Sequence, residues 1–181
     1  VDIRSGAIVG VEALLRWNHP ELGVVLPSRF IPIAEESNAI NRIGAWVLEE
    51  SCRQCRQWHD AGFGPLTIAV NLSVRQLNGF ELVRLLERTL SSTGLPAHCL
   101  KLELTESMMM SDVEMTLDTL RVLHAKGVQI VIDDFGTGYS SFAYLNQLPL
   151  SYLKIDRQFI TDLGKSGTQE TAMITRALIQ L

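Results

Sequence analysis

Short apolar segments rich in β-branched residues alternate along the chain with longer segments of helical periodicity. The apolar segments predict strands over residues 66–70, 99–104, 128–132 and 150–155. The periodic segments predict helices over residues 27–36, 41–61, 80–92, 111–126, 140–148 and 168–181. Strands that alternate with helices are typical of a mainly parallel sheet covered by helices.

The beginning of the chain carries a different signal. Residues 7–14 (AIVGVEAL) are typical of a strand, and Ser5-Gly6 before them is typical of a turn, so we expect residues 1–3 to form the first arm of a hairpin. A Gly-rich phosphate loop does not follow this strand, which argues against an open nucleotide-binding sheet. The pattern favours a (β/α)₈-type barrel. Such barrels have about 250 residues and this chain has 181, so we expect an incomplete one.

Composition narrows the class of function. The chain has 16 basic and 20 acidic side chains, which leaves a formal charge of −4 and argues against general binding of nucleic-acid polymers. No apolar run approaches the roughly 18 residues of a membrane span, so we expect no membrane contact from this segment and a cytoplasmic location. Three cysteines are too few for a disulfide scaffold and fit a reducing compartment.

Polar or charged side chains stand at the carboxyl end of each predicted strand. They are Glu12, Asn71, Glu103, the pair Asp133 and Asp134, and then Lys154 and Asp156. In barrels of this kind the carboxyl ends of the strands meet at one rim, where the chemistry takes place. We therefore expect these side chains to form one site.

The residue types indicate which chemistry that site would perform. Carboxylates and one amide oxygen are ligands suited to Mg²⁺ or Mn²⁺. The adjacent Asp133 and Asp134 can hold two ions, the standard arrangement for attack of water on a phosphodiester. Lys154 would orient the attacking water or stabilise charge on a phosphate, and the alternative is a simple salt bridge to Asp133 or Asp134. Arg16 could reach a phosphate from the loop above.

Several of these residues stand in motifs that resemble the EAL domain family. The motifs are VEALLRW around Glu12, Asn71-Leu72-Ser73, ELTES at 103–107, DDFGTGYSS at 133–141 and Leu153-Lys154-Ile155-Asp156. The resemblance covers essentially the whole chain. It implies a modified TIM-type barrel with one antiparallel strand, and metal-dependent hydrolysis of cyclic di-GMP to linear pGpG.

The resemblance also implies roles for individual residues. The metal ligands would be Glu12, Asn71, Glu103, Asp133 and Asp134. Lys154 would assist the nucleophilic water and Arg16 would bind substrate phosphate, while Glu106 would hold the 133–141 loop and couple it to the metal site and to a homodimer interface. Asp156 is either a neighbour of the phosphate site or a cap for the helix that follows it.

We expect residues 1–181 to be a single phosphodiesterase domain truncated at both ends. The resemblance implies a Gln before Val1, and a further catalytic Glu and a Gln beyond Leu181, so we expect the 181-residue chain by itself to turn over little substrate. We expect a signalling output module whose parent protein also carries a sensory or GGDEF domain. A membrane anchor in the parent protein is compatible with this expectation.

Three alternatives stay open at this point. The same fold serves as a non-catalytic cyclic di-GMP receptor or a protein-docking domain. A barrel lyase would use Lys154 to abstract a proton next to a carboxylate, although the tandem aspartates fit it less well. Finally, Cys52 and Cys55, with His59 four residues on, have metal-site spacing, but their place inside a long predicted helix favours a structural role.

Overall fold

The computed structural model describes residues 1–77, 79–105, 108, 113–136 and 147–158. Five strands form a parallel sheet in the order β1-β4-β5-β6-β7. The strands are β1 (Gly10–Ala13), β4 (Thr67–Asn71), β5 (Leu100–Thr105), β6 (Gln129–Phe135) and β7 (Tyr152–Ile155). The α-helices are α1 (Pro27–Glu36), α2 (Ala39–Asp60), α3 (Gly79–Thr93) and α4 (Val113–Ala125).

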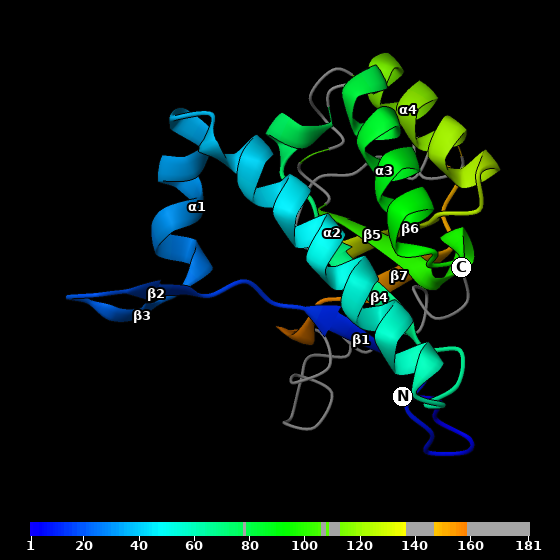
Figure 1. Cartoon of the computed structure of the whole chain (residues 1–181). Coiled ribbons are helices and arrows are strands. Elements are labelled where there is room, and N and C mark those ends of the chain that lie inside the picture. Colours follow the sequence, from blue (N-terminus) through cyan, green and yellow to red (C-terminus); the bar gives the residue numbers. More distant parts are fainter. Residues whose placement is uncertain (78, 106–107, 109–112, 137–146, 159–181) are drawn as a thin grey trace, which may run out of the picture.

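Smaller elements complete the described fold. Strands β2 (Trp17–His19) and β3 (Gly23–Val25) form an antiparallel ribbon, and η1 (Val74–Gln76) and η2 (Ala97–Cys99) are 3-10 turns. Figure 1 shows α2, α3 and α4 over one face of the sheet, while α1 and the β2–β3 ribbon project to one side. Among the described helices, none is both long enough and apolar enough to pass through a membrane.

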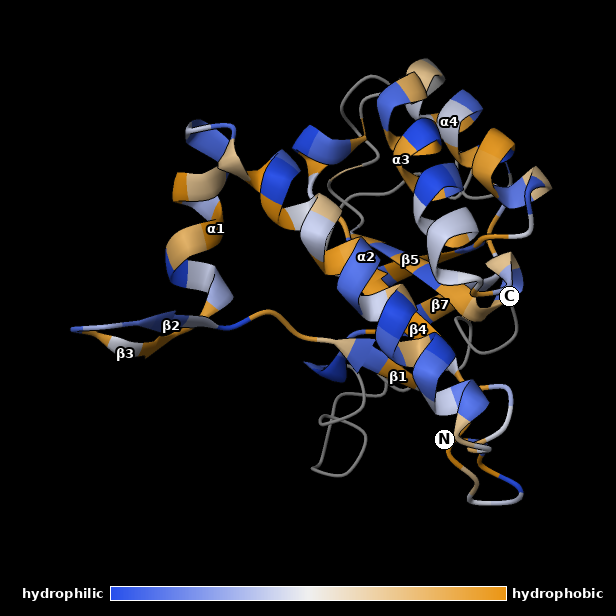
Figure 2. Ribbon diagram, in the orientation of Figure 1, coloured by the Kyte–Doolittle hydropathy of each residue, from blue (hydrophilic) through white to orange (hydrophobic). Residues whose placement is uncertain are grey.

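The core lies between the sheet and the helices. Along β5, Leu100, Leu102 and Leu104 alternate with more polar residues and are fully buried, as are Ile130 and Ile132 on β6. These apolar side chains lie on one face of the sheet, because successive residues of a strand point to opposite faces. Figure 2 shows the same division on the helices, with apolar stripes and hydrophilic surfaces. The polar residues of the strands are therefore left for the other face.

The sheet is curled rather than flat. The edge strands β1 and β7 are four strand spacings apart, about 19 Å in a flat sheet. Nevertheless, Lys154 Nζ on β7 lies 3.4 Å from Glu12 Oε2 on β1. Two side chains can bridge that span only if the sheet bends toward itself, so the five strands form a half-barrel whose concave face carries the polar residues.

Most of the predicted elements are confirmed. Helix α1 has the predicted bounds, and α2, α3, β4, β5 and β7 begin and end within two residues of prediction. Gly62, Gly94 and Gly127 follow their helices with positive φ, the conformation that lets glycine end a helix. The one antiparallel barrel strand that the family resemblance implies is not among the described strands of the five-stranded sheet, which pair in parallel. The helix expected at 168–181, and most of the one expected at 140–148, lie outside the described residues.

Two expectations at the beginning of the chain are wrong. The turn before Ala7 is present, with the Asp2 backbone hydrogen-bonded to Ala7 and Gly6, but residues 1–3 form no strand. The Asp2 carboxylate also accepts hydrogen bonds from the backbone of Arg4 and Ser5, which tightens the turn. The strand expected over 7–14 is limited to β1. The β2–β3 ribbon was not predicted, since its three-residue strands are too short to show a period.

Candidate active site

The register of the sheet brings five predicted site residues to one face. Asn71 on β4 is paired with Glu103 on β5, and Thr105 is paired with Asp133 on β6. On β1, Glu12 is paired with Ala69, which lies two residues before Asn71 on β4. On β7, Lys154 lies two residues after Tyr152. Tyr152 is paired with Val131, which lies two residues before Asp133 on β6. Residues two apart on a strand share a face. Glu12, Asn71, Glu103, Asp133 and Lys154 therefore all line the concave face.

Lys154 lies at the centre of this group. Its Nζ donates to Glu103 Oε2 at 2.7 Å, to Asp133 Oδ2 at 3.2 Å and to Glu12 Oε2 at 3.4 Å. One ammonium thus bonds to carboxylates from three strands. The expected salt bridge to Asp133 is confirmed, and Glu103 and Glu12 are two further partners that the sequence did not suggest. The amide of Asn71 donates to Glu12 Oε1 at 2.8 Å and holds that carboxylate from the other side.

The electrostatics of the cluster follow from its burial. The Glu103 side chain is only 2% exposed, and burial raises its pKa while the hydrogen bond and charge of Lys154 work against that rise. Burial acts to lower the pKa of Lys154, but the hydrogen bond to Glu103 and the charges of Glu103, Asp133 and Glu12 outweigh it, and the pKa stands above its ordinary value. Lys154 is therefore a firmly charged ammonium.

The donor set fits a divalent cation. Glu12, Glu103 and Asp133 each offer a carboxylate oxygen, and these oxygens lie within 4.8 Å of one another. They already surround a cation, the Lys154 ammonium. Hard oxygen ligands at this spacing suit Mg²⁺ or Mn²⁺.

Asp134 lies beside this cluster in a different conformation. Two residues of β6, Asp133 and Asp134, lie opposite the single residue Lys154 of β7, and Asp134 has a φ of 53°, in the left-handed region. This bulge separates the adjacent aspartates: Asp133 joins the cluster, and Asp134 faces Asp156. Burial, Asp133 and Asp156 together raise the pKa of Asp134. Contrary to expectation, both aspartates lie within the strand rather than after it.

Asp156 and Arg16 lie at the edges of the site. Asp156 Oδ1 accepts a hydrogen bond from the backbone of Gln158 at 2.6 Å, so the capping role that the sequence allowed is present. Arg16 is exposed, and its guanidinium donates to the carbonyl of Leu15 at 2.7 Å. Among the described residues, Lys154 rather than Arg16 forms the salt bridges to the carboxylate cluster. Glu106 and positions 137–141 of the loop lie outside the described residues.

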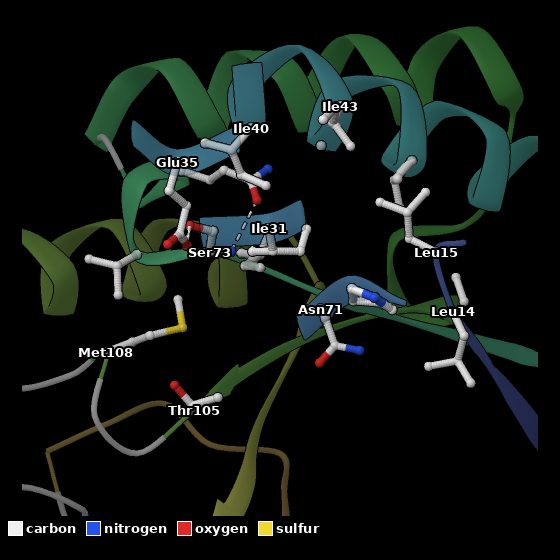
Figure 3. Close-up of a pocket in the computed structure, with 17 residues that line it drawn as sticks. Leu14, Leu15, Ile31, Glu35, Ile40, Ile43, Asn71, Ser73, Thr105 and Met108 are labelled. Carbon is white, nitrogen blue, oxygen red and sulfur yellow. Dashed lines mark hydrogen bonds between the residues drawn. The ribbon is translucent and has the colours of Figure 1, made fainter. Parts of the chain in front are cut away.

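A pocket of about 510 Å³ adjoins the cluster between α1, α2 and the ends of β1, β4 and β5. Figure 3 shows Asn71 and Thr105 on one side of it and Ile31, Ile40 and Glu35 on another. Glu35 Oε1 accepts a hydrogen bond from the Ser73 hydroxyl at 2.5 Å. The pocket is mainly apolar with a few polar groups, as is typical of ligand sites.

The sequence reasoning missed two features near this site. Glu35 was placed on a helix and given no role, because nothing local links it to Ser73, 38 residues away. Lys101, two residues before Glu103 on the same strand face, lies over the Tyr152 ring at 4.3 Å. The two-residue period of the strand was the signal that could have found Lys101.

The cysteines have the structural role that was favoured. Cys52, Cys55 and Cys99 are buried and unpaired. Burial raises the pKa of Cys52 to about 12 and that of Cys55 to about 11, so both stay protonated thiols. His59 Nε2 lies 2.8 Å from the Leu66 carbonyl oxygen, so this ring nitrogen has a hydrogen-bond partner in the backbone.

Comparison with known proteins identifies the family. The family model described as the EAL domain matches residues 1–181. The chain belongs to the EAL domain family. This EAL domain is 48% identical over 98% of its length to a bifunctional diguanylate cyclase/cyclic di-GMP phosphodiesterase, MucR, of Pseudomonas aeruginosa. It is 42% identical over 99% of its length to the cyclic di-GMP phosphodiesterase NbdA of the same organism. The chain spans 26% and 23% of these relatives.

Solved structures share the fold. A MucR phosphodiesterase in complex with c-di-GMP superposes with a TM-score of 0.88 at 48% identity, over 95% of this chain and 69% of that one. The EAL enzyme Bd1971, bound to cAMP and cyclic di-GMP, gives a TM-score of 0.89 at 34% identity, over 98% of this chain and 48% of that one. The TIM-like barrel class predicted from the sequence is thereby confirmed, and the half-barrel described above is part of it.

Proposed function

We propose that this EAL domain hydrolyses cyclic di-GMP to linear pGpG with Mg²⁺ or Mn²⁺. The observation that carries the proposal is the convergence of Glu12, Glu103 and Asp133 within 4.8 Å at the edge of a pocket of about 510 Å³. The names of MucR and NbdA and the c-di-GMP complex of MucR support the same substrate.

The proposal assigns a role to each part of the cluster. Glu12, Glu103 and Asp133 would hold the metal, with Asn71 and Asp134 as further ligands. When bound, the metal would supply activation of water and charge stabilisation on the phosphate. Asn71 would also keep the Glu12 carboxylate turned into the site through its amide hydrogen bond, which measures 2.8 Å.

The remaining residues would act on substrate and water. Lys154 would orient the attacking water, and Arg16 would turn from Leu15 to a phosphate. Asp156, which raises the pKa of the neighbouring Asp134, would lie next to the bound phosphate. For Glu106 and the 133–141 loop, the proposal keeps the coupling role that the family resemblance implies.

The pocket beside the cluster would take one guanine base. Asn71 belongs to both the pocket and the cluster, so a nucleotide with its phosphate at the carboxylates would direct its base into this space. Pro27 and Ile31 provide apolar surface for a planar ring. One Glu35 oxygen accepts from Ser73, and the second oxygen can accept from the N–H groups of guanine.

The proposal extends to the parent protein. We propose an output module that works in the cytoplasm, in keeping with its unpaired thiols. The proposal includes a GGDEF or sensory domain elsewhere in the parent protein, because the name of MucR joins a cyclase and a phosphodiesterase activity in one protein. It also includes a homodimer through the region near residues 133–141.

The test is to incubate the full-length protein with cyclic di-GMP and Mg²⁺ and to follow pGpG by chromatography and mass spectrometry. Glu12→Ala should lower turnover by at least about 100-fold, because metal-site residues act as a unit. Glu50→Ala is the matched control: Glu50 is exposed and bound to Arg53 on α2, and its loss should leave turnover unchanged. Tight binding of cyclic di-GMP without any pGpG would refute the enzyme and support the receptor.

A further inference from the structure

We infer that Lys154 is the resident counter-ion of the carboxylate cluster and competes with the divalent metal for it. In the metal-free protein the ammonium would join the two edges of the half-barrel, and metal binding would release it to act on water and phosphate. The inference rests on the metal-binding part of the proposed function and is independent of hydrolysis.

The geometry of the ammonium is the first argument. A lysine ammonium has three N–H donors, and Lys154 directs them to three carboxylates, those of Glu12, Glu103 and Asp133, at 3.4, 2.7 and 3.2 Å. In this arrangement all three donors are in use. Lys154 therefore cannot hold these carboxylates and orient a water molecule at the same time, although the proposed reaction needs the second role.

The charge of the cluster is the second argument. Three carboxylates approach within 4.8 Å of one another, and one of them, on Glu103, is 2% exposed. Like charges at such distances repel, and a buried charge is costly unless a partner compensates it. Lys154 provides that compensation. A divalent cation would provide more of it to the same oxygens, so the two cations compete for one set of ligands.

The position of Lys154 in the fold is the third argument. It lies on β7, at one edge of the five-stranded sheet, and its bond to Glu12 reaches β1 at the other edge. The bonds to Glu103 and Asp133 connect it to β5 and β6. The ammonium thus ties four strands together across the concave face, and its removal from the metal-free protein should loosen the mouth of the half-barrel.

Lysine labelling on the full-length wild-type protein tests the release directly. An amine-acylating reagent is applied with and without saturating Mg²⁺ or Mn²⁺, whose binding is measured by calorimetry, and the modified residues are mapped by mass spectrometry. Lys126 is the internal reference, because it pairs with Glu87 on the helical side of the molecule. We expect the labelling rate of Lys154 to rise at least about 5-fold with metal while that of Lys126 stays constant. An unchanged or lower rate at Lys154 in the metal-loaded protein would overturn the inference.

A variant tests the competition. Lys154→Met keeps an apolar stem and removes the charge, and Lys126→Met is the matched control. We expect Lys154→Met to bind Mn²⁺ at least about 5-fold more tightly than wild type, and its melting temperature to be lower than wild type without metal but not with it. Weaker Mn²⁺ binding by this variant would overturn the inference, as would the absence of Mn²⁺ binding by wild type.

The two proposals can fail separately. Release of Lys154 by metal without any pGpG would leave the counter-ion role in place and refute the enzyme. Production of pGpG with no change in Lys154 labelling would support the enzyme and refute the counter-ion role of Lys154. If Lys154→Met does not fold, the labelling of the wild-type protein decides the question alone.

Discussion

Substitution of Gly44 by alanine is expected to destabilise the protein, although alanine is the better helix former. Gly44 lies in the second turn of α2 and is buried against Gln76 of η1. A methyl group at this position would lie 1.8 Å from Nε2 and 2.6 Å from Cδ of Gln76, whose side chain is nearly buried. These atoms are the end of a flexible side chain, so Gln76 rather than α2 would move.

The displacement has a defined cost. Gln76 Oε1 accepts a hydrogen bond from the Ser73 backbone at 3.0 Å and forms a capping box at the start of η1. Loss of that bond, with the Ser73 N–H left without an acceptor, costs about 2 kcal/mol. Crowding between the new methyl group and the Gln76 side chain costs about 1 kcal/mol more. The higher helix propensity of alanine over glycine offsets about 1 kcal/mol of this loss. The net loss is about 2 kcal/mol, or a melting temperature lower by about 4 to 8 °C.

Denaturant unfolding of a double-mutant cycle checks this reasoning. In the Gln76→Ala background the obstacle is gone, so Gly44→Ala should change sign and stabilise the protein by about 1 kcal/mol. The coupling between the two positions would then be about 3 kcal/mol. If Gly44→Ala costs the same in both backgrounds, the close approach of α2 to Gln76 is not what requires glycine here.

Two further predictions concern metal and pH. Turnover should be supported by Mg²⁺ or Mn²⁺ and inhibited by Ca²⁺, because the larger and looser coordination of Ca²⁺ misplaces the attacking water. Equal rates with Ca²⁺ in a cyclic di-GMP cleavage assay would contradict the site proposed around Glu12. Burial raises the pKa of Cys52 from 9.0 to about 12 in the folded protein, so the native state holds this proton more tightly than the unfolded chain does. The resulting stability is present below about pH 9 and lost as pH rises toward 12. Cys52→Ala should flatten that loss in alkaline urea titrations, and an identical pH profile in wild type and variant would refute the assignment.

The sequence predicted that the strand-end residues converge, as they do in the structure, but not the geometry of the cluster that they form. Each strand ends with a polar residue in the sequence, and parallel strands bring their carboxyl ends to one rim, so Glu12, Asn71, Glu103, Asp133 and Lys154 could be named in advance. The adjacent Asp133 and Asp134 looked equivalent. The bulge in β6 and the positive φ of Asp134 separate them, and neither follows from a local pattern.

The sequence by itself determined the sheet strands, the long helices and the family. Periods of two and 3.6 residues in apolar side chains are local properties, and they placed α1, α2 and the sheet strands to within a few residues. The motifs around Glu12, Glu103 and Asp133 sufficed to indicate an EAL domain, which the family model confirms.

Tertiary structure alone decided which of these groups touch. Lys154 and Glu12 are 142 residues apart in the chain and on opposite edges of the sheet. They meet because strands twist and the sheet curls as its apolar face packs under the helices. The same holds for Gln76 against Gly44 and for Ser73 against Glu35. Such contacts depend on register, curl and helix packing together, and a local pattern of residues carries none of these three.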